Sequence, residues 1–366
     1  MNKDKVFPPV YYSDYLELDR ILGSQHPKSD EYNDPAHDEM LFIIMHQVVE
    51  LWFKQTLFEL DDVIRIFDSE NVDEKKLGTV THRLQRIVEI QKLLVEQIRV
   101  IETMTPLDFL DFRDYLIPAS GFQSYQFRLL ENRLGLEQDK RLKYNNTDYN
   151  KTLSAEHQKL LETKTPSLFQ LLNNWLERTP FIKPENFDFW KKYKEAVEEM
   201  LNNDEDIIKN NNSLSEEKRS RQLEMFRSTR ENFMSLFDES KHEEKIKDGS
   251  ARLSLKATLA ALFINLYRDE PILYLPFQVL NKIIEMDELF ATWRYRHSIM
   301  VHRLIGIKVG TGGSAGHNYL LQTVEKHRVF KDLFNISSYM IPRSQLPSLS
   351  DEIKSKMDFY YSQTSK

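Results

Sequence analysis

The chain of 366 residues contains no cysteine. This absence excludes disulfide bonds, thiolate metal sites and a thiolate ligand to a haem iron. A metal ion in this protein would therefore have to be held by histidine, aspartate, glutamate or tyrosine side chains.

Glycine and proline are also scarce, with 10 and 13 residues respectively. Because these two residues mark turns, their scarcity favours helices over many short strands. Hydrophobic residues make up 40% of the chain, which is enough for a sizeable core. We therefore expect a helical protein with one main body.

An excess of positive charge is missing as well. The 50 basic and 57 acidic side chains leave a net charge of −7, which disfavours a nucleic-acid partner. No uninterrupted apolar run approaches the length of a membrane span, and residues 1–9 lack the apolar core of a secretion signal. We expect a soluble, cytoplasmic protein without a membrane partner.

Apolar residues recur every three to four positions in several segments, which is the spacing of one helical face. This pattern predicts helices over residues 38–68, 72–103, 122–134, 153–178, 186–210, 250–267 and 317–330. A further helix is predicted to begin at Pro276 and to end near Lys308. Ser213 with Glu216 resembles a capping box that opens another helix, and residues 143–150 read as a loop.

These elements predict an all-α fold, a bundle of long antiparallel helices. Residues 1–35 contain several prolines and tyrosines, and we expect them to form an irregular arm that packs on a neighbouring subunit. Residues 36–366 are expected to form a single domain, with a charged helical excursion at about 186–248.

Four of the ten glycines lie between Gly310 and Gly316. The run is similar to a dinucleotide fingerprint, but that fingerprint follows a strand, whereas a long predicted helix precedes this one. A flexible linker is a second interpretation. We favour a loop that becomes ordered on binding, in which Thr311 and Ser314 present hydroxyl and backbone N–H groups to a polar ligand.

His297 lies on an apolar helical stripe with Trp293 and Val301. A histidine in such a place is more often a core residue bonded to a carbonyl. A neutral imidazole in an apolar pocket is also what axial ligation of haem requires. His302 lies about 140° further round the helix, so both histidines cannot serve one metal from the same face.

His46 and Arg113 are the other candidate site residues. His46 follows Phe42 by one helical turn, so the two side chains share a face, and alone it has the same ordinary explanation as His297. Arg113 lies among aromatic residues, where it could pair with Asp111 or Asp114 or grip a ligand carboxylate through two parallel bonds.

Three blocks of sequence together resemble the tryptophan 2,3-dioxygenase family. They are residues 37–47 with 50–55, residues 112–116 with 118–124 and 127–132, and residues 293–297 through 300–303 to 310–314. Their order and spacing both match the family over about residues 11–135 and 250–345, while residues 136–248 match weakly.

The resemblance implies an all-α homotetramer that encloses haem b, with ferrous iron in the active state. It also implies that both atoms of O₂ are inserted across the indole C2–C3 bond of L-tryptophan. The product would be N-formyl-L-kynurenine, in the first step of tryptophan catabolism by the kynurenine pathway. Two alternatives remain: a haem oxygenase of the same fold that acts on another indole or aromatic amino acid, and a helical oligomer that is not an enzyme.

The resemblance also assigns roles to individual residues. His297 would be the proximal iron ligand, and Trp293 and Gly121 would contact the haem. His46 would hydrogen-bond the indole N–H, Arg113 the carboxylate and Thr311 the ammonium group. The remaining substrate contacts implied are Phe42, Phe109, Leu116 and Ser120, with Tyr12 and Tyr15 reaching into a neighbouring subunit's site. Met45, Val49 and His317 depart from the family pattern beside these positions.

Overall fold

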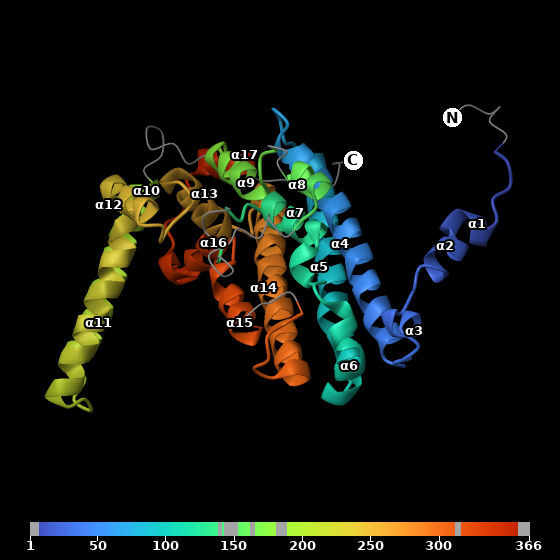
Figure 1. Ribbon diagram of the computed structural model, residues 1–366. Helices are drawn as coiled ribbons and strands as arrows, with labels where there is room; N and C mark the ends of the chain where they lie inside the picture. The colour runs from blue at the N-terminus through green and yellow to red at the C-terminus, as the bar shows by residue number, and fades with distance from the viewer. Residues whose placement is uncertain are drawn as a thin grey trace, which may run out of the picture.

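The computed structural model describes residues 7–137, 141–142, 153–161, 165–180, 189–311 and 316–357 (Figure 1). Throughout these ranges the regular structure is helical and contains no strand. The all-α fold class predicted from the sequence is therefore confirmed. The loop predicted over residues 143–150 lies outside the described residues.

The helices are numbered in chain order, and short 3-10 turns (η) connect some of them. The first group is α1 (Tyr12–Leu16), α2 (Leu18–Leu22), α3 (Lys28–Glu31), α4 (Glu39–Phe67), α5 (Glu74–Ile101), α6 (Pro106–Arg113), η1 (Asp114–Leu116), η2 (Gly121–Gln123) and α7 (Tyr125–Leu134). The middle group is α8 (Ala155–Leu161), α9 (Leu168–Glu177), α10 (Phe189–Lys209), α11 (Glu216–Met234), η5 (Ser235–Phe237) and α12 (Glu239–Lys247). The last group is α13 (Leu255–Leu266), α14 (Pro271–Ile305), α15 (His317–Lys326), α16 (Lys331–Asn335), η6 (Ile336–Tyr339), η7 (Arg343–Gln345) and α17 (Asp351–Met357).

Three long helices, α4, α5 and α14, form the centre of the molecule (Figure 1). The short connection at residues 68–73 makes α4 and α5 antiparallel. By contrast, α5 and α14 run in the same direction. Lys92 pairs with Glu285 at 3.1 Å, and Glu102, directly after α5, pairs with Arg296 at 2.8 Å. The chain between them therefore has to return to the start of α5 before α14 can begin.

The single helix predicted over residues 153–178 is wrong. The chain forms α8 and then starts a new helix, α9, after Ser167. The Ser167 hydroxyl accepts a hydrogen bond from the Gln170 backbone at 3.3 Å, and the Gln170 side chain accepts one from the Ser167 backbone at 3.0 Å. This capping box follows Pro166, whose ring disfavours helical geometry in the residue before it, so one continuous helix does not form.

The predicted start of the helix after residue 212 is displaced by two residues. The N-cap of α11 is Ser215, whose hydroxyl accepts a hydrogen bond from the backbone N–H of Lys218. The hydroxyl of Ser213 instead donates to the Asn211 side chain at 2.6 Å, which stabilises the preceding turn.

Pro276 does not open the long helix, as the sequence pattern predicted. Pro271 occupies the first position of α14, where its missing N–H leaves no hydrogen bond unmade, and Pro276 lies inside the helix. The helix predicted to end near Lys308 ends at Ile305. The helix predicted over 317–330 ends at Lys326, and two helices that were not predicted, α16 and α17, follow it.

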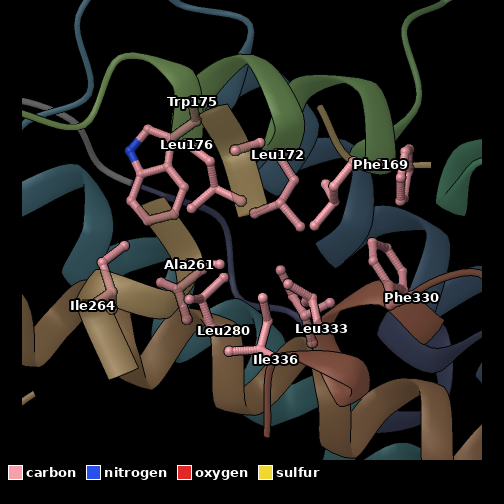
Figure 2. Close-up of a cluster of buried hydrophobic side chains, with 14 of the residues drawn as sticks. Phe169, Leu172, Trp175, Leu176, Ala261, Ile264, Leu280, Phe330, Leu333 and Ile336 are labelled. Carbon is pink, nitrogen blue, oxygen red and sulfur yellow. The ribbon is translucent and has the colours of Figure 1, made fainter. Parts of the chain in front are cut away.

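The main hydrophobic core extends from α4, α5 and α14 to α9 and α13, and Figure 2 shows the part of it around α9 and α13. Trp175 and Leu172 of α9 point towards residues of those helices, and the rings of Phe169 and Phe330 are 5.9 Å apart. A second, smaller cluster contains Ile98, Ile101, Met104, Phe109, Phe112, Met300, Leu304 and Ile305. Trp293 packs against both clusters, so it marks the boundary between them.

Two parts of the chain extend away from this body (Figure 1). Neither α1 nor α2 contains a buried residue, and Tyr12 and Tyr15 are 75% and 76% exposed. At the opposite side α11 projects outward, and Phe233 near its end is its one buried residue. Among the residues that the structure describes, no helix combines the length and the apolar character needed to cross a membrane.

Candidate active site

A cavity opens at the boundary between the two hydrophobic clusters. Residues from α4, α5, α6, α7, α14 and α15 line it, together with Gly310 and Thr311. The space in which the centre of a water molecule can move measures about 280 Å³. Apolar and aromatic side chains form most of its wall, which is typical of sites for small organic ligands.

His46 borders this cavity from α4. Its Nδ1 atom lies 2.7 Å from the carbonyl oxygen of Phe42, one turn earlier. Because a carbonyl oxygen can only accept, Nδ1 carries the proton, and Nε2 remains available as an acceptor when the ring is neutral. Solvent reaches the ring through the cavity, yet the protein atoms around it lower the pKa of His46 through burial. The neutral ring is therefore favoured.

Aromatic rings surround His46. The Phe42 ring centroid is 4.2 Å from that of His46, 5.7 Å from that of Phe109 and 5.5 Å from that of Phe112. Phe42 comes from α4 and the other two from α6, so contacts between these helices fix the shape of this wall. Such rings provide a flat apolar surface for an aromatic ligand.

His297 borders the same cavity from α14. Its ring nitrogens form no hydrogen bond with any residue in the described parts of the chain. Burial, with a smaller contribution from His46, lowers the pKa of His297 to about 4, so the imidazole is neutral at physiological pH. The Trp293 ring lies beside it, with centroids 5.5 Å apart and planes only 8° from parallel. An unpartnered neutral imidazole is an available metal ligand.

Arg113 and Thr311 lie at one end of the cavity, on segments that contact each other. The Arg113 Nη2 atom donates to the carbonyl oxygen of Val309 at 2.6 Å, and Nη1 donates to the Asp114 carboxylate at 3.0 Å. The Thr311 hydroxyl donates to the carbonyl oxygen of Ala119 at 2.7 Å. These bonds place a guanidinium and a hydroxyl group beside one cavity although the two residues are far apart in the sequence.

Ser120 and Gly121 also line the cavity. The Ser120 hydroxyl accepts from the backbone N–H of Phe122 at 3.3 Å and so starts η2. In the part of the chain that the structure describes, a Cβ atom added to Gly121 would meet no atom within 4 Å apart from its chain neighbours.

The remaining sequence candidates lie elsewhere. Leu116 packs against the smaller hydrophobic cluster and is not among the residues that line the cavity. Tyr12 and Tyr15 are on the projecting arm, outside the cavity of their own chain. Of the glycine run, residues 312–315, including Ser314, lie outside the described residues.

Comparison with known proteins identifies the family. The family model described as tryptophan 2,3-dioxygenase matches residues 3–340. The chain belongs to the tryptophan 2,3-dioxygenase family. A tryptophan 2,3-dioxygenase of Bdellovibrio bacteriovorus is 50% identical over 357 residues, which cover 97% of this chain and 99% of the relative. That of Dictyostelium discoideum is 47% identical (96% and 89% covered), and that of Rattus norvegicus is 46% identical (93% and 84% covered).

The similarity to tryptophan 2,3-dioxygenases is therefore broader than the three blocks of sequence suggested. An alignment that covers 97% of the chain includes most of residues 136–248, where the motifs alone matched weakly. Family membership thus applies to the chain as a whole and not only to the helices around the cavity.

One further group of cavity residues received no role from the sequence. Glu131 of α7 is 2% exposed, and its carboxylate accepts hydrogen bonds from Arg128 at 2.8 Å and from Arg294 at 2.7 Å. Arg141 lies 3.7 Å from the same carboxylate. The nearby arginines, with a hydrogen bond from His327, hold the pKa of Glu131 well below its ordinary value despite burial, which acts to raise it.

This ion cluster joins separate elements of the family fold. Leu142 donates its backbone N–H to Nε2 of His327 at 3.3 Å, so the ring's proton is on Nδ1, 3.4 Å from Glu131. Arg294 lies one turn before His297 on α14, and Glu131 thus ties α7 to the helix that carries His297. In the sequence, the i, i+3 spacing of Arg128 and Glu131 was the one pattern that could have indicated this ion cluster.

Proposed function

We propose that this protein is a haem-dependent dioxygenase that inserts both atoms of O₂ across the indole C2–C3 bond of L-tryptophan. The product is N-formyl-L-kynurenine, and the reaction opens tryptophan catabolism by the kynurenine pathway. Membership of the tryptophan 2,3-dioxygenase family supports the activity. The roles of individual residues are supported by one observation. Two neutral imidazoles, Arg113 and Thr311 border the same cavity.

The residues present fit haem b, with ferrous iron in the active state. A porphyrin supplies four iron ligands and needs one axial imidazole, whereas a non-haem site needs several protein ligands. No three histidine or carboxylate side chains gather to hold a metal ion in the described ranges. His297 would hold the iron through a ring nitrogen, and Trp293 and Gly121, which line the same cavity, would contact the macrocycle. When bound, haem supplies the chemistry that activates dioxygen.

The protein's own contribution is to hold L-tryptophan in one orientation. Arg113 grips the carboxylate through its guanidinium fork, and Thr311 contacts the ammonium group. The indole ring would lie against Phe42, Phe109 and Ser120, which line the cavity, while Leu116 would contribute through the smaller cluster on which it packs. Fixing reactants in this way lowers a barrier by roughly 7–11 kcal/mol in favourable cases.

His46 orients the indole and need not remove its proton. The proton on Nδ1 is held by the Phe42 carbonyl, which leaves Nε2 to accept a hydrogen bond from the indole N–H. An indole N–H is a weak acid, and the lowered pKa of His46 makes its ring a weak base. A hydrogen bond that sets the position of the ring is therefore the better-supported role.

The assembled enzyme is proposed to be a homotetramer in the cytoplasm. The arm of residues 1–35 would extend from the catalytic domain of residues 36–366, which carries the charged excursion at about 186–248. The exposed rings of Tyr12 and Tyr15 support an arm that is covered only in an assembly. In that arrangement the two tyrosines contact substrate in a neighbouring subunit's site.

A single-turnover experiment tests the activity. Protein purified with haem supplied is reduced under anaerobic conditions and then mixed with L-tryptophan and ¹⁸O₂. We expect mass spectrometry to find a product heavier than tryptophan by two ¹⁸O atoms. A haem-loaded, reduced protein that leaves L-tryptophan unchanged, or that adds a single oxygen atom, would contradict the proposal. The same mixture without haem is the control.

A further inference from the structure

The arm joins the catalytic body at a compact block, residues 28–39, that we name the arm base. Glu39, the first residue of α4, is 1% exposed. Its carboxylate accepts hydrogen bonds from the backbone N–H groups of Lys28 at 2.8 Å and Ser29 at 2.9 Å. The fully buried Ser29 hydroxyl accepts from the backbone of Ala36 at 3.0 Å. The arm base is therefore internally fixed, in contrast to α1 and α2.

Tyr115 of η1 connects this arm base to the region of Arg113. Its ring stacks on that of Tyr32, with centroids 4.9 Å apart and planes 20° from parallel. Its hydroxyl donates to the Asp34 carboxylate at 2.8 Å. This hydrogen bond is the main reason why the pKa of Tyr115 is raised. The hydroxyl proton is thus committed to Asp34.

A turn in the arm base presents these two partners together. Asn33 has a φ of +57°, a left-handed conformation that asparagine tolerates better than most residues. The turn is closed by a bond from the Asp34 backbone to the Ser29 carbonyl at 3.0 Å. Tyr32 and Asp34, on either side of Asn33, can therefore meet the same tyrosine.

Arg113 is the last residue of α6, and η1 begins at the next residue. Only 18% of its side chain is exposed, so the direction of the guanidinium group depends on the backbone where α6 passes into η1. Tyr115 lies two residues after Arg113 and anchors the junction between α6 and η1 to the arm base. Its apolar ring also packs on the small cluster that contains Phe109 and Phe112.

We propose that Tyr115, held by Asp34 and Tyr32 of the arm base, is a positioning residue for the Arg113 clamp. The proposal rests on the proposed function, in which Arg113 binds the substrate carboxylate. Tyr115 touches neither substrate nor haem in this scheme. Loss of its hydroxyl removes the hydrogen bond between η1 and the arm base and lets the Arg113 guanidinium depart from the geometry that two parallel bonds require.

The arrangement also connects the arm with the chain's own site. Glu39 starts the helix that carries Phe42 and His46, and Tyr115 follows Arg113, so the arm base is connected to two elements that carry cavity residues. A change in how the arm is held would therefore reach the amino-acid clamp of the same subunit through this block.

The test is the haem-loaded Tyr115→Phe variant, which keeps the stacked ring and removes the hydrogen bond. We expect its KM for L-tryptophan to rise about three- to tenfold, the size expected for one net hydrogen bond, while kcat stays within about twofold. Tryptamine, which lacks the carboxylate, serves as an inhibitor that cannot use Arg113. Its inhibition constant should not change, because only the carboxylate clamp is displaced.

Two further variants distinguish the positioning role of Tyr115 from a general loosening of the fold. Asp34→Ala removes the same bond from the other side, so its effect on KM should match that of Tyr115→Phe and should not add to it in the double variant. Tyr267→Phe is the matched control. The Tyr267 hydroxyl donates to the Pro347 carbonyl at 2.6 Å, away from the cavity, and its loss should leave both constants unchanged.

The outcomes are distinct. An unchanged KM in Tyr115→Phe, an equal loss of tryptophan and tryptamine binding, or additive effects in the double variant would overturn the positioning role. Arg113→Ala is measured in parallel. If that variant also keeps a normal KM, the clamp in the proposed function is wrong; if its KM rises while Tyr115→Phe is normal, only the link through Tyr115 is wrong.

Discussion

The Nη2 atom of Arg113 donates a 2.6 Å hydrogen bond to the carbonyl oxygen of Val309, just before the glycine run. In the opposite direction, the Thr311 hydroxyl donates a hydrogen bond to the carbonyl oxygen of Ala119, in the segment that follows Arg113. The two groups proposed to bind the charged ends of an amino acid are thus each held by the other's segment. A substrate carboxylate, as a charged acceptor, would compete well with the Val309 carbonyl for Arg113.

Replacing Arg113 with alanine should raise KM for L-tryptophan about tenfold to a hundredfold, since a hydrogen bond to a charged group contributes about 1.5–3 kcal/mol. Steady-state kinetics with the haem-loaded variant measures the effect. Arg133→Ala is a suitable control, because Arg133 pairs with Asp61 at 2.7 Å outside the cavity. A normal KM and kcat in Arg113→Ala would argue against the clamp.

Replacing His297 with alanine should abolish haem retention, because the unpartnered imidazole is the proposed axial ligand. The haem content is measured from the absorbance of the Soret band in protein that has been purified with haem supplied. His302→Ala should keep a full haem complement, since the exposed His302 ring packs against His317 with centroids 4.3 Å apart. A fully loaded His297→Ala protein would disprove the assignment.

The activity should depend on pH through His46. Burial lowers the pKa of His46 below its ordinary value of 6.5, so the acceptor Nε2 is available at neutral pH and is lost only as the pH falls through that lowered pKa. We expect kcat/KM for L-tryptophan to be level from pH 8 down to about 6.5 and to fall below it. His46→Ala should lack this acid limb. An acid limb with a midpoint above 6.5 would be inconsistent with a buried neutral ring.

Glu131→Gln should destabilise the fold by about 3–5 kcal/mol at pH 7, because it leaves buried arginines without their carboxylate. Urea unfolding of the haem-free protein measures the loss, and Glu96→Gln, on the exposed Arg99 pair, should cost less than about 1 kcal/mol. Folding lowers the pKa of Glu131, so its stabilisation is complete above the ordinary pKa of 4.5 and is lost as the pH falls further. The difference in the free energy of unfolding between the wild type and Glu131→Gln should therefore become smaller below pH 4.5. Equal stability at pH 7 would show that the cluster contributes little.

Deleting residues 1–20 removes α1 and most of α2 but keeps the arm base. Because these helices bury nothing in their own chain, the variant should fold and retain haem. Its turnover of L-tryptophan should fall if Tyr12 and Tyr15 complete a neighbouring site. Unchanged turnover would count against an arm shared between subunits.

The sequence predicted the long helices well where one apolar face runs without interruption. The predicted helices over 38–68 and 72–103 agree with α4 and α5 to within two residues, because buried positions such as Leu84, Ile87 and Ile98 keep the helical spacing. The sequence did not predict the helix boundaries that depend on a single N-cap residue. Ser167 and Ser215 each accept a specific backbone N–H, and the apolar pattern contains no information about which serine will do so.

The cavity was predictable only through the family resemblance. Spacing alone could not distinguish a core role from a ligand role for His46 and His297, because they lie on helices far apart in the chain. The Glu131 cluster was missed for the same reason, since Arg128, Arg141 and Arg294 come from three separate segments. Contacts between distant segments depend on the packing of whole helices, and a local pattern does not show them.

The parallel pairing of α5 and α14 has a consequence for biosynthesis. The second helix of this pair is translated only after most of the polypeptide has left the ribosome, and it carries the imidazole proposed to bind iron. Nascent chains would therefore expose the apolar face of α5 until synthesis is almost finished, a period in which chaperones could bind it. Acquisition of the proposed haem would then be a late event in maturation, and a prematurely terminated chain would lack the imidazole proposed to retain it.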